Sequence, residues 1–268
     1  MSLLEAIALG SVQGLTEFIP ISSSGHLVVV PELLGWAEPG LAFDVWLHVA
    51  SLLALVVYFS GDLVDLARGA AANDPAARKL VVLLAVGTVP AALAGVLWGD
   101  YFEESFTDAK AAALQLLITA AILVAAERFL AHHEHRTAQE GRRLRGMGDL
   151  NPADAGLIGI AQAVSILPGI SRSGATIGVG LALGVARDDA ARFAFLLAIP
   201  ALAGAALVKV PELSGASPGL GAGFAGFAAS LVTSYAAIFA LIKYLRSNNL
   251  YPFAAYCLVA GVVFYVLL

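Results

Sequence analysis

The chain has 268 residues, of which 59% are hydrophobic and 13% charged, and its mean hydropathy is +0.84. Soluble domains carry about 25% charged residues, so this composition excludes an ordinary soluble protein and indicates an integral membrane protein. The formal net charge of −5 gives no basis for a nucleic-acid partner. Cys257 is the only cysteine, which excludes a disulfide framework and a thiolate metal site and leaves it as a core residue.

Six apolar segments approach the roughly 20 residues with which a helix crosses the hydrocarbon core. In chain order they are Leu41–Ser60, Lys79–Trp98, Ala109–Leu130, Ala190–Val210, Gly219–Leu245 and Leu250–Leu268. Two further apolar regions, 1–35 and 153–186, are interrupted by polar turns that contain proline and glycine. The sequence therefore predicts an all-α polytopic membrane protein, folded as a single membrane domain.

The basic residues predict the orientation of these segments. Of the 15 Lys and Arg residues, 12 lie in the loops 61–79 and 128–150 or at the adjoining ends of the fourth and fifth spans. The positive-inside rule places these regions in the cytoplasm and both chain termini outside. Region 153–186 then begins and ends on the cytoplasmic side, so it cannot cross. We expect it, and region 1–35, to form re-entrant helical hairpins, whose turns must line protein or a water-filled cavity.

The two hairpins resemble each other. "GSVQGLTEFIPISSSG", 10–25, aligns with "GIAQAVSILPGISRSG", 159–174. The matched residues are Gln13 with Gln162, Ser22 with Ser171, Ser24 with Ser173 and Gly25 with Gly174. Each hairpin precedes three predicted spans, an odd number, so the second copy is inserted upside down. This predicts an inverted-topology repeat, with repeat 1 over about 1–130, a cytoplasmic linker over about 131–150 and repeat 2 over about 151–268.

Glu17, His26 and Arg172 lie close to the two turns, and an unpaired ionisable group is costly in a membrane. The simpler interpretation is that they pair with one another and hold the broken helices together. The alternative is an anion site, because a serine- and glycine-rich turn ahead of a helix presents backbone N–H groups and a favourable dipole. The candidate phosphate-binding residues are Ser22, Ser24, Gly25, Ser171, Arg172, Ser173 and Gly174. Serine hydroxyls beside a carboxylate and an imidazole are also the groups that a hydrolase uses.

Two motifs, "QGLTEFIPISSSGH" and "PGISRSGATI", resemble the signature motifs of the undecaprenyl-diphosphate phosphatases, the bacitracin-resistance family of bacterial membrane proteins. The resemblance implies that one phosphate is removed from a long-chain polyprenyl diphosphate, which regenerates the lipid carrier for peptidoglycan. It implies Mg²⁺ or Ca²⁺ as cofactor and a plasma-membrane site that opens to the periplasm or exterior. The implied catalytic residues are Glu17, Ser23, His26 and Arg172, with Glu17 and Gln13 as candidate metal ligands. Glutamine at position 13 leaves one carboxylate fewer for the metal.

Three other polar residues are candidates for the cavity wall. Asp44 and His48 are four residues apart, hence on one face of the first span, and Gln162 is the counterpart of Gln13. Asp44 is expected near the outer interface. The "HHEH" run at 132–135 is interpreted as part of a solvated linker, because it lies in the basic loop.

The competing function is a lipid or anion transporter without hydrolysis, since inverted repeats and broken helices are typical of transporters. A phosphatase with a histidine nucleophile is a further alternative, but neither turn contains a second histidine to support it. A second copy of the chain, as a homodimer, is an additional candidate partner.

Overall fold

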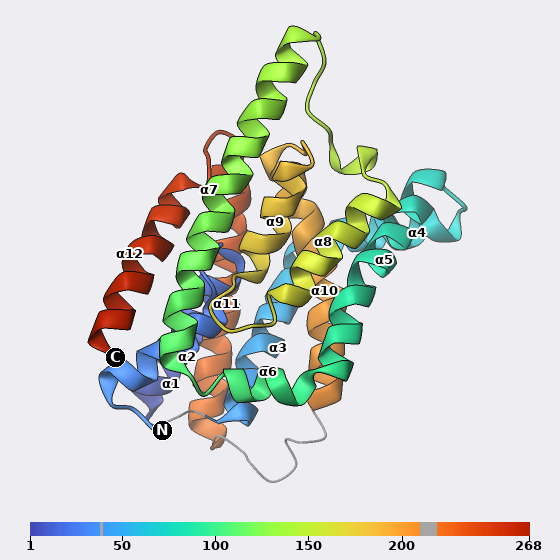
Figure 1. Ribbon diagram of the computed structural model, residues 1–268. Helices are drawn as coiled ribbons and strands as arrows, with labels where there is room; N and C mark the ends of the chain where they lie inside the picture. Colours follow the sequence, from blue (N-terminus) through green and yellow to red (C-terminus); the bar gives the residue numbers. More distant parts are fainter. Residues whose placement is uncertain (38–39, 210–218) are drawn as a thin grey trace.

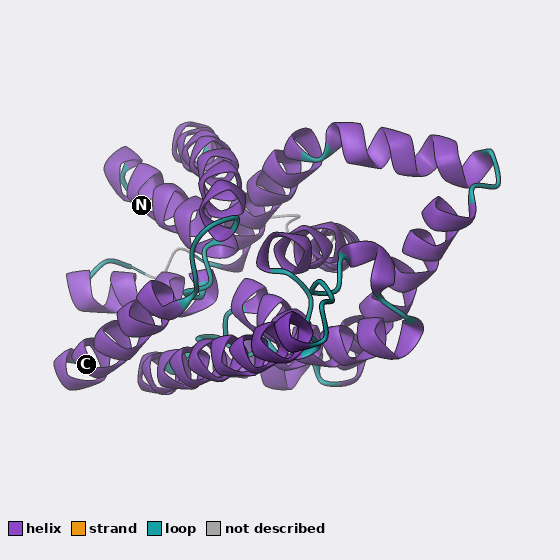
Figure 2. Cartoon of the chain, turned by 90° about the horizontal axis from the view of Figure 1, so that it is seen from above, coloured by secondary structure: helices purple, strands orange, loops and turns teal. Residues whose placement is uncertain are grey.

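The computed structural model describes residues 1–37, 40–209 and 219–268. These residues form helices and loops, with no strand among them (Figures 1 and 2). The α-helices are α1 (Leu3–Phe18), α2 (Ser23–Leu34), α3 (Leu41–Tyr58), α4 (Ser60–Ala71), α5 (Pro75–Leu97), α6 (Gly99–Ser105), α7 (Ala109–Gln139), α8 (Pro152–Val164), α9 (Arg172–Ala182), α10 (Arg187–Lys209), α11 (Leu220–Leu245) and α12 (Tyr251–Leu267). A 3-10 turn, η1 (Met147–Asp149), precedes α8.

Helices α1 and α8, the first helices of the two predicted hairpins, begin with the same local device. Ser2 caps α1 and exchanges hydrogen bonds with Glu5, which forms a capping box. Asn151 caps α8 and does the same with Asp154, while Pro152 occupies the first turn, where its missing N–H costs nothing. Both helix starts are therefore determined by local sequence.

Each of the six predicted spans coincides with a helix: α3, α5, α7, α10, α11 and α12. The predicted end of the fourth span, Val210, lies outside the described residues. By length and apolarity, four described helices can cross a membrane, namely α5, α7, α10 and α11. Helices α3 and α4, which meet at a 67° bend, make a fifth span if the pair counts as one. Helix α12, with 17 residues, is only about 26 Å long, short of a core of about 30 Å. Thus the chain is a polytopic helical membrane protein, and the count of six spans is not confirmed.

Helices occupy much of the regions that the sequence assigned to loops, including 99–105, where α6 lies. Residues 61–79 contain most of α4 and the start of α5, and residues 131–139 continue α7 beyond the predicted span end at Leu130. Hydropathy does not detect a helix beyond the point where it leaves the apolar layer, although the helical backbone continues without a break. The "HHEH" run thus lies on α7 rather than in a linker. The ion pair between Arg136 and Glu140, at 3.0 Å, supports this last turn.

The aligned segments of the two hairpins make equivalent contacts. Helix α1 packs along α11, and α8 packs along α5. A Cβ atom on Gly10 would lie 2.2 Å from the carbonyl oxygen of Gly226, and one on Gly159 would lie 2.3 Å from that of Gly87. Gly10 and Gly159 occupy the same position of the internal alignment. Glycine at both positions therefore permits the same close helix–helix approach at two contacts between the halves of the chain.

Both chain termini lie at one end of the helix bundle, and the C-terminal end of α7 lies at the opposite end (Figure 1). At the α7 end, buried Glu127 accepts a hydrogen bond of 2.6 Å from Arg187 of α10 and one of 2.8 Å from the backbone N–H of Leu250, just before α12. One carboxylate thereby ties α7 to two helices of the second half of the chain. The position of the termini relative to a membrane stays a prediction.

Candidate active site

The turns of the two hairpins meet in the interior. The backbone N–H of Gly169, in the second turn, donates a 3.2 Å hydrogen bond to the Ser22 hydroxyl, in the first. Thr119 of α7 holds the second turn, because its hydroxyl donates to the Gly169 carbonyl at 2.8 Å and accepts from the Ser171 N–H at 3.0 Å. Gly169 has a φ of 99°, and a Cβ on Gly25 would lie 3.0 Å from the Gly169 Cα. The close approach therefore depends on glycine in both turns.

Each turn ends in a serine that caps the following helix. The Ser22 hydroxyl accepts from the Gly25 N–H at 3.3 Å, and the Ser171 hydroxyl accepts from the Gly174 N–H at 3.1 Å. The hydroxyl pairs Ser22–Ser24 and Ser171–Ser173 are 3.2 and 3.1 Å apart. Ser22 has a φ of 67°, which a non-glycine residue rarely adopts, so this turn is held in a strained conformation. Gly25 and Gly174 thus take part in the helix caps and do not line the cavity.

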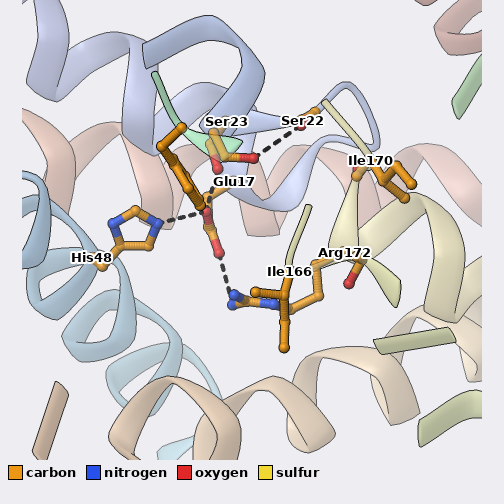
Figure 3. Close-up of a pocket in the computed structure, with 11 residues that line it drawn as sticks. Glu17, Ser22, Ser23, His48, Ile166, Ile170 and Arg172 are labelled. Atoms are coloured by element: carbon orange, nitrogen blue, oxygen red, sulfur yellow. Dashed lines mark hydrogen bonds and ion pairs between the residues drawn. The ribbon is translucent and has the colours of Figure 1, made fainter. Parts of the chain in front are cut away.

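A cavity of about 90 Å³ lies between the two turns (Figure 3). Its lining residues are Glu17, Ser22, Ser23, Ser24, His48, Phe106, Ser165, Ile166, Ile170, Ser171 and Arg172. Seven of these were candidate site residues from the sequence. The candidates that do not line it are Gln13, Gly25, His26, Asp44, Gln162, Ser173 and Gly174. The two motifs, far apart in the sequence, thus contribute to one polar cavity inside an apolar protein.

Glu17 is the centre of the polar contacts in this cavity. Arg172 donates to its Oε1 at 3.2 Å, and the Ser23 hydroxyl donates to its Oε2. Gln13 Nε2 donates to the same Oε2 at 3.1 Å, and His48 Nε2 lies 3.7 Å from it. Figure 3 shows Glu17 between the His48 ring and the Arg172 guanidinium. The ion pair joins the two hairpins, as the simpler interpretation predicted, and the same carboxylate contacts the candidate nucleophile.

His26 is buried next to the cavity rather than in it. Its Nδ1 lies 2.7 Å from the Ser22 carbonyl oxygen, to which it donates, and its Nε2 lies 2.7 Å from the Tyr256 hydroxyl. The two rings also stack, with centroids 5.7 Å apart. Because both ring nitrogens have partners, His26 fixes the first turn against α12. His26, implied by the resemblance as a catalytic residue, therefore lies close to Ser22 but is not among the residues that line the cavity.

Gln13 connects Glu17 to a group of buried serines that the sequence analysis did not identify. Its Nε2 lies 3.4 Å from the Ser51 hydroxyl, which is 3.2 Å from that of Ser230 and 2.9 Å from that of Ser234. All three serines are fully buried. Ser51 follows His48 by three residues, so its position on the same helix face as Asp44 and His48 was the available signal. The α11 serines had no such signal.

The remaining candidates lie apart from the cavity. The backbone carbonyl of Asp44 accepts a 2.8 Å hydrogen bond from His48 Nδ1. Gln162 is buried, and its amide atoms have no hydrogen-bond partner within the described part of the chain. Its counterpart Gln13 points to Glu17, but no carboxylate occupies the equivalent position of the second motif, which has Ile166. The internal repeat therefore supplies one acidic site and not two.

The cavity residues fit a divalent cation that is held only in part by protein. Next to the cavity, Gln13 Oε1 is buried and has no hydrogen-bond partner within the ranges described, while Nε2 of the same amide donates to the Glu17 carboxylate. No group of three or more His, Cys, Asp and Glu side chains that could hold a metal occurs in residues 1–37, 40–209 and 219–268. Mg²⁺ commonly takes one or two carboxylates and completes its shell with phosphate oxygens and water. The donor set suits such an ion and does not suit a closed protein cage.

Comparison with known proteins agrees with the motifs and the geometry. The family model described as "Bacitracin resistance protein BacA" matches residues 6–263. A protein named undecaprenyl-diphosphatase from Pelobacter propionicus is 41% identical, over 97% of this chain and 95% of the relative. Proteins of the same name from Idiomarina loihiensis and Methanosphaera stadtmanae are 39% and 38% identical, over 100% of this chain and 99% and 98% of their own. The chain therefore belongs to the family of the bacitracin resistance protein BacA.

Proposed function

We propose that this protein is a membrane phosphatase that hydrolyses undecaprenyl diphosphate to undecaprenyl phosphate and inorganic phosphate. The product is the lipid carrier for peptidoglycan and other envelope polymers, and its regeneration would confer bacitracin resistance. The observation that carries the proposal is the Ser23 hydroxyl, which donates to Glu17 in a cavity shared with Arg172. A transporter needs an anion-binding turn, but it has no use for a serine hydroxyl hydrogen-bonded to a buried carboxylate.

The first step in this scheme is the capture of the terminal phosphate. Arg172 is bound to Glu17 in the structure, and its guanidinium can turn to hold two phosphate oxygens. The hydroxyls of Ser22, Ser24 and Ser171 line the same space and add neutral donors. When Arg172 turns to the phosphate, the Glu17 carboxylate keeps its hydrogen bond from the Ser23 hydroxyl, whose proton it can take. Substrate binding therefore leaves the carboxylate in position for proton transfer.

The second step is attack on phosphorus. Glu17 takes the proton of the Ser23 hydroxyl, and the Ser23 oxygen attacks the terminal phosphorus or orients the water that does so. The bond from that phosphorus to the bridging oxygen breaks, and undecaprenyl phosphate leaves. Arg172 stabilises the charge on the phosphoryl oxygens during this step. If Ser23 is the nucleophile, Glu17 first passes this proton to the departing undecaprenyl phosphate. Water then attacks the phosphoserine and gives a proton to Glu17, the bond from phosphorus to the Ser23 oxygen breaks, and Glu17 returns the proton to that oxygen as inorganic phosphate leaves.

Glu17 and Gln13 would hold the divalent cation, Mg²⁺ or Ca²⁺. When bound, the cation would neutralise charge on the diphosphate oxygens and polarise the phosphorus–oxygen bond. Before the cation binds, Gln13 keeps Glu17 oriented, because its Nε2 donates to Oε2 from one turn earlier on α1.

We propose that both termini lie outside the cell, which the 12 basic residues in and beside the segments 61–79 and 128–150 support. The proposal that the cavity opens to the periplasm or exterior rests on the family resemblance. A homodimer stays a prediction.

The deciding experiment measures phosphate release from undecaprenyl diphosphate by the purified full chain in detergent. Multiple turnovers that depend on Ser23 are expected. The same protein in liposomes should not move a prenyl phosphate across the bilayer. Transport without phosphate release would make the competing function correct. Folded protein, checked by gel filtration, is the control for each variant.

A further inference from the structure

We infer that His48 is a nitrogen ligand of the divalent cation at this site, and that the site consequently prefers a transition-metal ion such as Mn²⁺ to Ca²⁺. The inference rests on the proposed function only in placing a cation at Glu17. The sequence analysis treated His48 as a candidate for the cavity wall, with no chemical role, whereas the structure gives its ring a specific orientation.

The hydrogen bond at the far side of the ring determines which nitrogen carries the proton. His48 Nδ1 lies 2.8 Å from the backbone oxygen of Asp44, and a carbonyl oxygen can only accept. Nδ1 is therefore protonated. In a neutral imidazole the other nitrogen, Nε2, then has a free lone pair. A backbone carbonyl that fixes the tautomer and the ring plane in this way is the usual support of a metal-binding histidine.

The free nitrogen faces another acceptor. His48 Nε2 lies 3.7 Å from Glu17 Oε2, which is too long for a hydrogen bond. Arg172 binds the other carboxylate oxygen, Oε1, so its charge does not lie between the two acceptors. Two lone pairs that face each other repel unless a cation lies between them. Metal–ligand distances of about 2 Å on each side are compatible with this separation after a small rotation of either side chain.

The Gln13 amide favours a metal ion over a proton in the space between Glu17 and His48. A proton on His48 Nε2 would form an ion pair with Glu17 and would leave the buried Gln13 Oε1 without a partner. A divalent cation accepts three or more ligands, and a half-turn of the Gln13 amide would present this oxygen on the Glu17 side, where Nε2 now donates. Glu17, His48 and Gln13 together offer two oxygens and one nitrogen. The side chain of His48 is 29% exposed and lines the cavity, so an ion can reach it.

The composition of this donor set determines the metal preference. Imidazole nitrogen suits transition-metal ions, whereas Ca²⁺ and Mg²⁺ prefer carboxylate, carbonyl and water oxygens. Position 13 contributes an amide, so the set has a single negative charge, which is weak for Ca²⁺. The His48 nitrogen is then the main source of selectivity between Mn²⁺ and Ca²⁺. We expect Mn²⁺ to bind at least about tenfold more tightly than Ca²⁺ to the protein without substrate.

The experiment is Mn²⁺ titration of the purified full chain, followed by electron paramagnetic resonance. Pulsed spectra of bound Mn²⁺ should contain one histidine nitrogen coupling, which changes when the protein carries ¹⁵N-labelled histidine. The coupling should vanish in His48→Gln, and Mn²⁺ affinity should fall at least about tenfold, the scale of losing an element of metal support. His132→Gln, which removes an exposed histidine from α7, is the matched control and should keep both.

Several results would overturn the inference: no histidine coupling in the unmodified protein, a coupling that persists in His48→Gln, or one that vanishes in His132→Gln. His48→Asp provides a second variant if His48→Gln does not fold, because it keeps a ligand and should shift the preference from Mn²⁺ to Ca²⁺. Phosphate release without histidine coupling would refute the inference and leave the proposed function intact. Histidine coupling without phosphate release would refute the proposed function and leave the inference about His48 intact.

Discussion

Arg172 Nη1 donates to Glu17 Oε1 across 3.2 Å, and the two residues are 155 positions apart in the chain. Each lies beside the turn of a different hairpin, Glu17 at the end of α1 and Arg172 at the start of α9. Among the described residues, this ion pair brings together the only carboxylate and the only guanidinium of the cavity lining. The pair is therefore both the connection between the two motifs and the part of the site that substrate must rearrange.

Arg172→Lys should lower kcat by about 10²- to 10³-fold, as the loss of an oxyanion donor does. A guanidinium can hold two phosphate oxygens and stays charged when buried, whereas an ammonium is a point charge. Steady-state kinetics in detergent, beside Arg172→Ala, measure the effect. Near-normal turnover of the lysine variant would mean that positive charge alone suffices.

Ser23→Ala should lose activity, whereas Ser22→Ala should lose stability. Ser23 contacts Glu17 and faces the cavity, so its loss should remove most turnover and leave the melting temperature nearly unchanged. Ser22 accepts from the N–H groups of Gly25 and Gly169, so its loss should cost about 1 kcal/mol of stability. Kinetics and thermal unfolding of both variants test this assignment. Normal turnover of Ser23→Ala would show that a different hydroxyl is used.

Tyr256→Phe tests whether His26 acts in the chemistry or in the structure. The change removes the hydroxyl from His26 Nε2, which should cost about 1 kcal/mol of stability. Turnover should stay within about threefold of the unmodified protein, because that ring nitrogen does not face the cavity. A loss of 100-fold or more (about 2.7 kcal/mol) with intact folding would place His26 in the proton pathway.

Removal of divalent cations should abolish phosphate release, and Glu17→Gln should have the same effect. The carboxylate is needed in ionised form as base and as the charged metal ligand, whereas an amide cannot act as a base and brings no negative charge to the metal. The measurement is phosphate release after chelation, followed by addition of Mg²⁺, Ca²⁺ or Mn²⁺ in turn. Readdition should rescue the unmodified protein and not Glu17→Gln. Full activity in excess chelator would remove the cation from the scheme.

Arg143→Cys, in a Cys257→Ser background, should resist an impermeant thiol reagent in intact cells and react after permeabilisation. The Arg143 side chain is 79% exposed, so access to the cysteine depends on the side of the membrane and not on burial. The prediction follows from the distribution of basic residues. Labelling in intact cells would reverse the proposed orientation.

Local sequence determined the helices and the turns. The apolar segments, the serine caps before α2 and α9 and the internal alignment of the two motifs are patterns of neighbouring residues, which is why they could be predicted without a structure. The motifs also identified most of the cavity lining. The candidate chemistry of each motif could be predicted as well, because its serines and its ionisable residue lie within one or two helical turns of each other.

Tertiary structure decided which polar side chains face one another. His26 was predicted to be catalytic and His48 only to line the cavity, yet it is His48 that faces Glu17, because α12 offers Tyr256 as a partner to the His26 ring. Gln13 and Gln162 align, yet only Gln13 contacts a carboxylate. Side-chain direction across three or more helices depends on their crossing angles and separations, and these follow from contacts such as Gly10 against Gly226. These crossing angles cannot be read from the order of residues along the chain.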